Sequence, residues 1–173
     1  MTGRRPRLDT QLADITVLEV DVVVNAANTS LAGGGGVDGA IHRAAGAAEL
    51  HAACRALGGC TPGDAKATPG FGLPATWIVH AVGPVWRGGD AGEERVLASC
   101  YRRSVEVAEE LGARSIAFPA ISTGVYGFPA DRAAAVAVAT LASLETETVD
   151  QVILVAFDRT TLGHYRRRLA DLD

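Results

Sequence analysis

Lysine, cysteine and aromatic residues are scarce in this chain. Lys66 is the single lysine among 16 basic residues, and aromatic residues make up 5% of the sequence. Three cysteines, an odd number at uneven spacing, argue against a disulfide scaffold and favour a reducing compartment. The 20 acidic residues give a net charge of −4, which argues against an electrostatic grip on long nucleic acid.

Long apolar runs are also missing. The longest uncharged stretch, 69–86, is interrupted by glycine and proline before its apolar half, so we expect no membrane span. The arginines near the start lead into a polar segment, so we expect no signal peptide. With 48% hydrophobic residues, the chain can build one folded domain, spanning 1–173, which we expect to be cytoplasmic and, by default, monomeric.

Strand-like and helix-like segments alternate along the chain, which is typical of an α/β domain with helices on both faces of a mostly parallel sheet. A Thr-x-x-Glu pattern at 16–19 has the form of a capping box and predicts a short helical turn. Gly46 interrupts the alanine-rich segment 37–57 and predicts two consecutive helices there. The remaining predicted elements are strands at 22–24, 77–82, 115–118 and 151–157, and helices at 93–111, 130–144 and 162–172.

The first glycine-rich loop, 28–39, follows the strand at 22–24. Four consecutive glycines, Gly33 to Gly36, allow backbone N–H groups to approach a ligand closely. A helix that begins near Val37 directs its positive end to the same place, which suits a phosphate group. A flexible surface loop is the alternative interpretation of the same glycines.

Asp38 and His42 are four residues apart and therefore share one face of that helix near its N-terminus. The Asp38 carboxylate can orient or deprotonate a water molecule, or hold a ribose hydroxyl. It can equally serve only to complement the helix dipole. A lone histidine such as His42 is often a hydrogen-bonded structural residue, so neither residue alone identifies the chemistry.

A second loop suited to phosphate, 118–129, joins another strand to a helix. The backbone N–H groups of Ser122 to Tyr126 can surround phosphate oxygens, while the Tyr126 ring covers a sugar. Neither loop contains a lysine. Two such loops predict a diphosphate held by backbone dipoles, with no metal and no cofactor.

Other motifs fit less well. The segment 34–39 matches the G-x-G-x-x-G pattern of dinucleotide-binding folds, but nine residues separate the strand end from the glycines. His51, Cys54 and Cys60 lack a fourth zinc ligand, so we interpret the cysteines as buried free thiols. Ser122 lacks the G-x-S-x-G elbow that would favour a Ser-His-Asp hydrolase.

Five blocks occur in order along the chain: Ala-Asp-Ile-Thr at 13–16, Val-Asn-Ala-Ala-Asn at 24–28, the glycine loop and helix start at 33–42, Gly-Asp-Ala-Lys at 63–66, and the loop at 118–129. Together they resemble the macrodomain family, specifically its ADP-ribose-hydrolysing, MacroD-type branch. The similarity runs from about residue 8 to the end. Ala13 stands where a glycine is common in the family, and Tyr126 where a phenylalanine is frequent; neither changes the expected ligand.

The resemblance implies a three-layer α/β/α sandwich around a mixed, mostly parallel sheet, with ADP-ribose in a cleft across the strand ends. Asp14 would accept a hydrogen bond from the adenine amino group, beside Ile15, and Phe157 would pack on the adenine. Asn28 and Asp38 would meet the distal ribose. The diphosphate would lie between two loops, formed by Gly34, Gly35, Gly36 and Val37 and by Ser122, Thr123, Gly124, Val125 and Tyr126.

In the same branch, Asn28, Asp38 and His42 match positions tied to catalysis. The implied reaction is hydrolysis of an ester on the distal ribose, in O-acetyl-ADP-ribose or in proteins mono-ADP-ribosylated on aspartate or glutamate. Asp38 would activate or position the water; alternatively, the substrate's own diphosphate holds the water and Asp38 only shapes the site. Another macrodomain branch uses a lysine nucleophile, but MacroD-type sequences carry the lysine at the position of Lys66 without that role.

A non-catalytic ADP-ribose reader is the main alternative, because binding ground and transition states equally gives no rate acceleration. The intact block from Asn28 to His42 favours the enzyme. A nucleic-acid-directed domain is disfavoured by the net charge and by the lack of a clustered basic and aromatic surface, unless the nucleic acid itself carries ADP-ribose. The position of the glycines disfavours a nicotinamide-dependent dehydrogenase.

Overall fold

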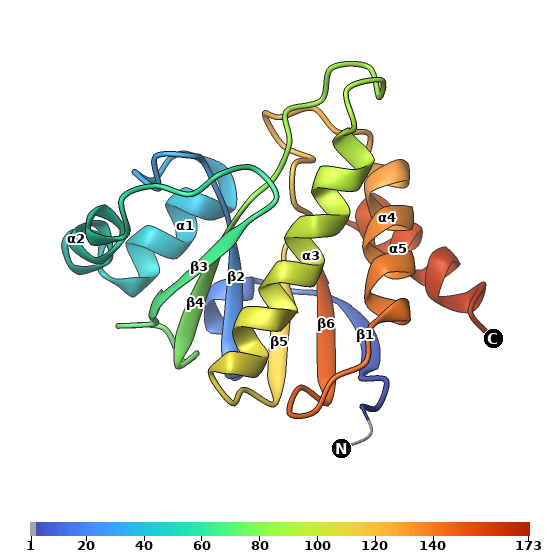
Figure 1. Ribbon diagram of the computed structural model, residues 1–173, viewed down its shortest axis with the longest axis horizontal. Coiled ribbons are helices and arrows are strands. Elements are labelled where there is room, and N and C mark those ends of the chain that lie inside the picture. Colours follow the sequence, from blue (N-terminus) through green and yellow to red (C-terminus); the bar gives the residue numbers. More distant parts are fainter. Residues whose placement is uncertain (1–2) are drawn as a thin grey trace.

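A computed structural model describes residues 3–173, so the first two residues of the predicted domain lie outside the described part. Within it, the chain forms a six-stranded sheet, five α-helices and one short 3-10 helix (Figure 1). The elements are β1 (Arg7–Leu12), η1 (Ile15–Val17), β2 (Val22–Ala27), α1 (Gly36–Ala45), α2 (Ala47–Leu57), β3 (Ala65–Pro69), β4 (Trp77–Val82), α3 (Glu93–Glu110), β5 (Ser115–Phe118), α4 (Ala130–Ser143), β6 (Gln151–Ala156) and α5 (Arg159–Ala170).

The sheet is mixed and mostly parallel, as the sequence predicted. Its strand order is β1-β6-β5-β2-β4-β3. The β1–β6, β6–β5, β5–β2 and β2–β4 pairs are parallel, and only the edge strand β3 runs antiparallel to its neighbour β4. The predicted run of valines at 22–24 forms the first half of β2, which lies between β5 and β4 and is buried on both faces.

Successive residues of β2 enter two different hydrophobic cores, one on each face of the sheet. Val22 and Val24 pack with α3, α4 and α5, whereas Val23 packs with α1 and α2. Figure 1 shows α1 and α2 together on one side of the sheet and the other three helices grouped apart from them. The predicted three-layer α/β/α architecture is therefore confirmed.

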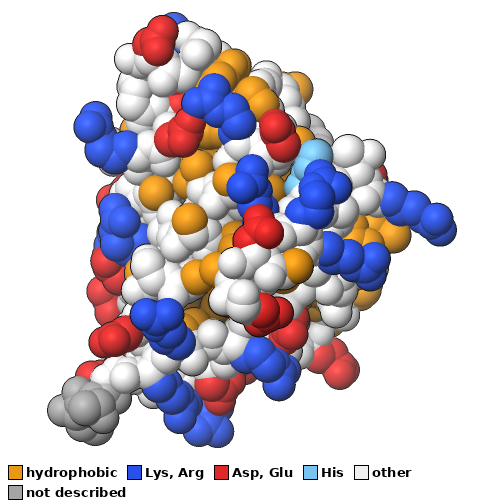
Figure 2. All heavy atoms as spheres, turned by 90° about the vertical axis from the view of Figure 1, so that its right-hand side faces the viewer, with side chains coloured by type: hydrophobic (Ala, Val, Ile, Leu, Met, Phe, Trp, Pro, Cys, Tyr) orange, Lys and Arg blue, Asp and Glu red, His pale blue; other side chains and the backbone are white. Residues whose placement is uncertain are grey.

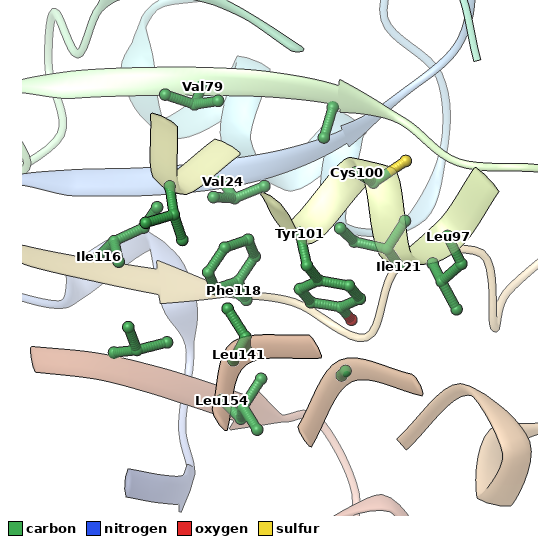
Figure 3. Close-up of a cluster of buried hydrophobic side chains, with 14 of the residues drawn as sticks. Val24, Val79, Leu97, Cys100, Tyr101, Ile116, Phe118, Ile121, Leu141 and Leu154 are labelled. Atoms are coloured by element: carbon green, nitrogen blue, oxygen red, sulfur yellow. The ribbon is translucent and has the colours of Figure 1, made fainter. Parts of the chain in front are cut away.

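The larger core lies beneath α3 and anchors the segment after β5. The Tyr101 ring packs against Phe118, the last residue of β5, with 4.9 Å between ring centroids. Ile121 is fully buried in the same cluster, beside Leu97 and Tyr101 (Figure 3). The loop that follows Ile121 therefore starts from a fixed point in the core.

Three predicted boundaries are corrected by the structure. Helix α5 begins at Arg159 rather than at 162, because the Asp158 carboxylate caps it by accepting from the Thr161 N–H at 2.8 Å. Strand β6 ends at Ala156, which leaves Phe157 beyond the strand. The short turn near 16–19 is capped from the preceding residue, Asp14, so the predicted capping box does not form.

Among the described residues, no helix combines the length and apolar character that crossing a membrane requires. Figure 2 shows the side of the molecule that carries α5. There, arginine side chains alternate with acidic ones and do not merge into one basic area. Charges of both signs are therefore distributed over this face.

Candidate functional site at the carboxyl ends of the strands

The segments predicted to bind ligand all leave the sheet at one edge. Strands β2, β4, β5 and β6 run parallel, so their carboxyl ends meet at the same edge. In parallel sheets this edge is where ligands bind. The segments that leave it are the glycine loop after β2, the loop 83–92 after β4, the loop 119–129 after β5, and Phe157 after β6.

The glycine loop ends where α1 begins, as predicted. Gly34, Gly35 and Gly36 are solvent-exposed, and no side chain of the described residues caps the helix N-terminus. The first backbone N–H groups of α1 therefore point toward solvent next to the loop, together with the positive end of the helix dipole. Val37 is half-buried and packs against the smaller core. This arrangement can accept a phosphate group without any cation.

Asp38 is buried at the start of α1, with 6% of its surface exposed. Its Oδ1 accepts a hydrogen bond from Asn25 Nδ2 at 2.8 Å and lies 3.3 Å from His42 Nε2. Its Oδ2 faces Gly34 of the glycine loop. If Gly34 carried a Cβ atom, that atom would lie 3.4 Å from Oδ2. One carboxylate oxygen is thus held by the protein and the other faces the loop.

Asn28 also lies next to Gly34. Its Nδ2 is 3.9 Å from the same hypothetical Cβ and donates to the Gly33 carbonyl at 3.1 Å. Its Oδ1 accepts from the Ser30 hydroxyl at 2.8 Å and from the Ala32 N–H at 3.3 Å. The structure therefore brings Asn28, Asp38 and the glycine loop together, with the His42 ring beside Asp38 and next to Gly33 of the same loop.

The second predicted loop is tightly folded around Ser122. This residue is buried and has a φ of +68°, a conformation that costs free energy in a residue other than glycine. Phe128 N–H donates to the Ser122 carbonyl at 2.9 Å, which closes the loop. The Ser122 hydroxyl has no hydrogen-bond partner within residues 3–173, so no Ser-His-Asp triad is assembled around it.

The tip of this loop is open to solvent. Thr123 and Tyr126 are half-buried, Gly124 is exposed, and the Val125 side chain is fully exposed. Among the described residues, the N–H groups of 124–126 donate to no backbone carbonyl, whereas the N–H groups of 127 and 128 do. The N–H groups of 124–126 are therefore available for the predicted phosphate cradle, whereas the Thr123 N–H donates to the Ala120 carbonyl at 3.4 Å.

A buried carboxylate organises the neighbouring loop, 83–92. Glu93 accepts hydrogen bonds from the N–H groups of Arg87, Gly89 and Ala91 at 2.7–2.9 Å. These bonds, that of Arg87 first, lower the pKa of Glu93 to about 2. In the same loop, the Trp86 N–H donates to the Tyr126 carbonyl at 2.8 Å, so the two loops are joined.

The predicted adenine end lies at the ends of β1 and β6. Ala13 N–H donates to the Ala156 carbonyl at 3.2 Å, which brings the two chain segments together. Asp14 is exposed, and its Oδ1 accepts from both the N–H and the hydroxyl of Thr16, which lowers the pKa of Asp14. Ile15 is buried, whereas Phe157 has 93% of its surface exposed. An exposed aromatic ring of this kind is available for stacking.

Lys66 is held by the protein backbone. Its ammonium group donates to the carbonyls of Leu57 and Gly59, at 3.2 and 2.7 Å, at the C-terminal end of α2. Cations at this end of a helix stabilise it. The contacts describe a structural lysine and do not support a nucleophile.

Two buried polar residues next to Asp38 were given no role from the sequence. Asn25 on β2 and His80 on β4 are both fully buried, and Asn25 Nδ2 lies 3.1 Å from His80 Nδ1. The signal was present, because each interrupts an otherwise apolar buried strand. Cys54 lies 3.7 Å from His80, and burial raises its pKa to about 11, as expected for an inert thiol. In the part of the chain that the structure describes, no three His, Cys, Asp or Glu residues cluster as metal ligands.

Comparison with known proteins agrees with this geometry. The sequence model of the Macro domain matches residues 24–137. The chain belongs to the macrodomain family. This macrodomain is 56% identical over 160 residues to a macro domain-containing protein of Chlorobaculum tepidum, which covers 91% of this chain and 92% of the relative. It is 54% identical over 165 residues to a Klebsiella pneumoniae protein named O-acetyl-ADP-ribose deacetylase. That match covers 92% of this chain and 94% of the Klebsiella protein.

A solved structure, that of a mutant Oceanobacillus iheyensis macrodomain with ADPR (ADP-ribose), superposes on this macrodomain with a TM-score of 0.92. The two chains are 39% identical, and the match covers 99% of this chain and 97% of the other. The fold and the order of the loops are therefore shared over nearly the whole length.

Proposed function

We propose that this macrodomain binds ADP-ribose along the carboxyl edge of its sheet and hydrolyses esters of the distal ribose. The substrates are O-acetyl-ADP-ribose and proteins mono-ADP-ribosylated on acidic side chains. A relative bears the name O-acetyl-ADP-ribose deacetylase, and a similar solved structure contains ADP-ribose. These findings support the ligand and the reaction class.

The ligand's orientation follows from the chemistry of each segment. Adenine stacks on Phe157 and donates to Asp14, whose carboxylate keeps Oδ2 free. The diphosphate lies between the first turn of α1 and the loop 122–126, where N–H groups face solvent. The distal ribose then reaches Gly34, between Asn28 and Asp38.

A single observation carries the enzymatic proposal: Asp38 is buried, and only its Oδ2 faces the glycine loop. A carboxylate anchored through Oδ1 can use Oδ2 to orient a water molecule and accept its proton. Water then adds across the ester, and ADP-ribose and a free carboxylic acid are released. Asn28 holds the ribose hydroxyls in this arrangement, and His42 supports Asp38 through its Oδ1 atom.

The test follows both ester reactions in one preparation without added metal. Wild-type protein is mixed with O-acetyl-ADP-ribose, or with a protein mono-ADP-ribosylated on glutamate, and free ADP-ribose is measured by chromatography. Replacing a general base lowers the rate by about 10²–10⁴-fold, so Asp38→Asn should show that loss at saturating substrate. Glu49→Gln is the matched control, because Glu49 is an exposed acid in the first turn of α2.

Each outcome has a defined meaning. Equal single-turnover rates for wild type and Asp38→Asn would contradict the base assignment and favour water held by the substrate's diphosphate. Binding of ADP-ribose in calorimetry without release from either ester would make this macrodomain a reader. Absence of both binding and release would contradict the whole proposal.

A further inference from the structure

A buried chain of polar side chains runs from Asp38 into the smaller core. It passes from Asp38 to Asn25 (2.8 Å), from Asn25 to His80 (3.1 Å), and from His80 Nε2 to the Thr68 hydroxyl (2.9 Å). All four residues are buried. Asn25, His80 and Thr68 lie on β2, β4 and β3, and Asn25 pairs directly with His80 across the two parallel strands. The chain therefore links Asp38 to the edge strand β3.

The direction of each hydrogen bond follows from that of Thr68, the residue farthest from Asp38. The Thr68 hydroxyl donates to the Pro69 carbonyl at 3.2 Å, so toward His80 it acts as an acceptor. The imidazole proton is thus on Nε2, and Nδ1 carries a lone pair. Burial, with a smaller effect of nearby His42, lowers the pKa of His80 to about 4, which keeps the ring neutral at physiological pH.

The Asn25 amide is thereby fixed. One hydrogen of its Nδ2 group goes to Asp38 and the other to the lone pair of His80 Nδ1. The opposite orientation would set an amide oxygen against the Asp38 carboxylate and against the His80 lone pair. The Asn25 Oδ1 atom has no hydrogen-bond partner within residues 3–173, which costs free energy in a buried position. The protein keeps this orientation although one polar atom is left unpaired.

We propose that His80 is a positioning residue for Asp38: its unprotonated Nδ1 holds the Asn25 amide as a double donor, and the amide holds Asp38 Oδ1 so that Oδ2 faces the ribose. This inference rests on the proposed function, because it assigns the residue that sets the geometry of the reacting carboxylate. His80 does not touch the substrate. Its effect should appear in turnover and not in ligand affinity.

Two substitutions separate this role from space filling. In His80→Asn, the amide oxygen takes the place of Nδ1 and can still accept from Asn25. In His80→Gln, the amide reaches the place of Nε2 and the acceptor for Asn25 is lost. Glutamine is closer to histidine in volume, so a packing role predicts that Gln is the better replacement. A hydrogen-bonding role predicts that Asn is the better replacement.

We expect kcat for ester hydrolysis to fall about 10–100-fold in His80→Gln, because small displacements of a reacting group have effects of this size. His80→Asn should retain most of the activity, and the ADP-ribose dissociation constant should stay unchanged in both. Thr68→Val removes the hydroxyl acceptor for Nε2–H and leaves the more distant Cys54 sulfur, at 3.7 Å, so it should lower kcat and also leave affinity unchanged. His51→Asn, a histidine on α2, is the control and should match wild type.

Nitrogen-15 NMR of the wild-type protein supplies a readout that does not depend on activity or on the variants folding. The chain has four histidines, so the His80 signal can be assigned. We expect a neutral ring with the proton on Nε2 between pH 5 and 8, the range set by the pKa of about 4. A proton on Nδ1, or higher kcat in His80→Gln than in His80→Asn, would overturn the inference. Failure of wild type to hydrolyse either ester contradicts the proposed function instead. The NMR result then still decides the direction of the hydrogen bonds between Asn25, His80 and Thr68.

Discussion

Gly39, in the first turns of α1, lies so close to Gly34 that a Cβ atom on it would be 2.5 Å from the Gly34 carbonyl oxygen. No real Cβ contact is this short, so the absence of a side chain at Gly39 sets how closely the helix and the glycine loop can approach. Gly34 stands between Asn28 and Asp38. The position of the loop therefore depends on a glycine that is itself buried.

Gly39→Ala should push the glycine loop away from α1 and weaken ADP-ribose binding. Overpacking of this kind costs about 1–3 kcal/mol of folding free energy. We expect the ADP-ribose affinity, measured by calorimetry, to fall about ten-fold. This loss corresponds to about 1.4 kcal/mol of binding free energy, which lies within the same range. Gly163→Ala is the control: in α5 its new Cβ meets only Arg167 at 3.5 Å, so binding should be unchanged. Unaltered binding in Gly39→Ala would show that the loop adapts.

Phe157→Ala should reduce ADP-ribose affinity without affecting stability. Stacking of a base on an aromatic side chain contributes about 1–3 kcal/mol. The ring is 93% exposed, so its removal leaves no cavity. Calorimetry should show a complex weaker by about 5- to 150-fold, the range that this energy corresponds to, while thermal unfolding is unchanged. Leu172→Ala, another exposed apolar side chain at 52%, should alter neither quantity. Equal affinity of Phe157→Ala and wild type would remove Phe157 from the adenine site.

Glu93→Gln should destabilise the protein at neutral pH, and the difference from wild type should shrink in acid. The folded-state pKa of Glu93 is lowered to about 2, below its ordinary value of 4.5. The carboxylate therefore contributes stability that is fully present above about pH 4.5 and is lost as pH falls toward 2. Urea unfolding of both proteins at pH 7 and pH 3 measures the difference. A difference that does not depend on pH would contradict the assignment.

The same substitution should weaken ADP-ribose binding at pH 7, because Glu93 shapes the loop whose Trp86 N–H holds the Tyr126 carbonyl. Trp86 also packs on Phe128 with 4.7 Å between ring centroids. Glu106→Gln, an exposed acid elsewhere on α3, is the matched control and should bind normally.

Lys66→Met should lower stability and leave kcat unchanged. The ammonium group loses two hydrogen bonds to backbone carbonyls, a loss of about 1–3 kcal/mol. Both of these carbonyls lie at the C-terminal end of α2 and not in the glycine loop. Borohydride should trap no covalent adduct on wild-type protein during turnover. A trapped Lys66 adduct, or loss of turnover in a folded Lys66→Met variant, would restore the lysine as a nucleophile.

Sequence patterning located the central strands and the ligand loops but not the two edge strands, β1 and β3. An edge strand has a neighbouring strand on one side only and is less buried than a central strand, so it does not need a continuous run of apolar residues. Arg7, Asp9 and Gln11 alternate along β1, and Lys66 and Thr68 lie on one face of β3. Such polar content resembles that of a loop when only the sequence is read.

The residues around Asp38 were predicted where local spacing determines contact. Asp38 and His42 meet because they are four apart on a helix. Asn25 and His80 were missed because their contact depends on the pairing of β2 with β4, 55 positions apart in sequence. The need for glycine at 39 was missed for a similar reason, since it depends on how the loop folds back over the helix.

The pairing of β1 with β6 determines when the adenine end of the site can form during synthesis. Thr10 and Leu154 are partners although 144 positions separate them, so β1 has no neighbour in the sheet until β6 has emerged. By then the strands that carry the glycine loop and the loop 119–129 have already been made. A chain released before β6 would lack Phe157, and it would also lack Val152 and Leu154, which complete the larger core. The proposed adenine end, formed by Asp14 and Phe157, is therefore the last part of the proposed site that synthesis can complete.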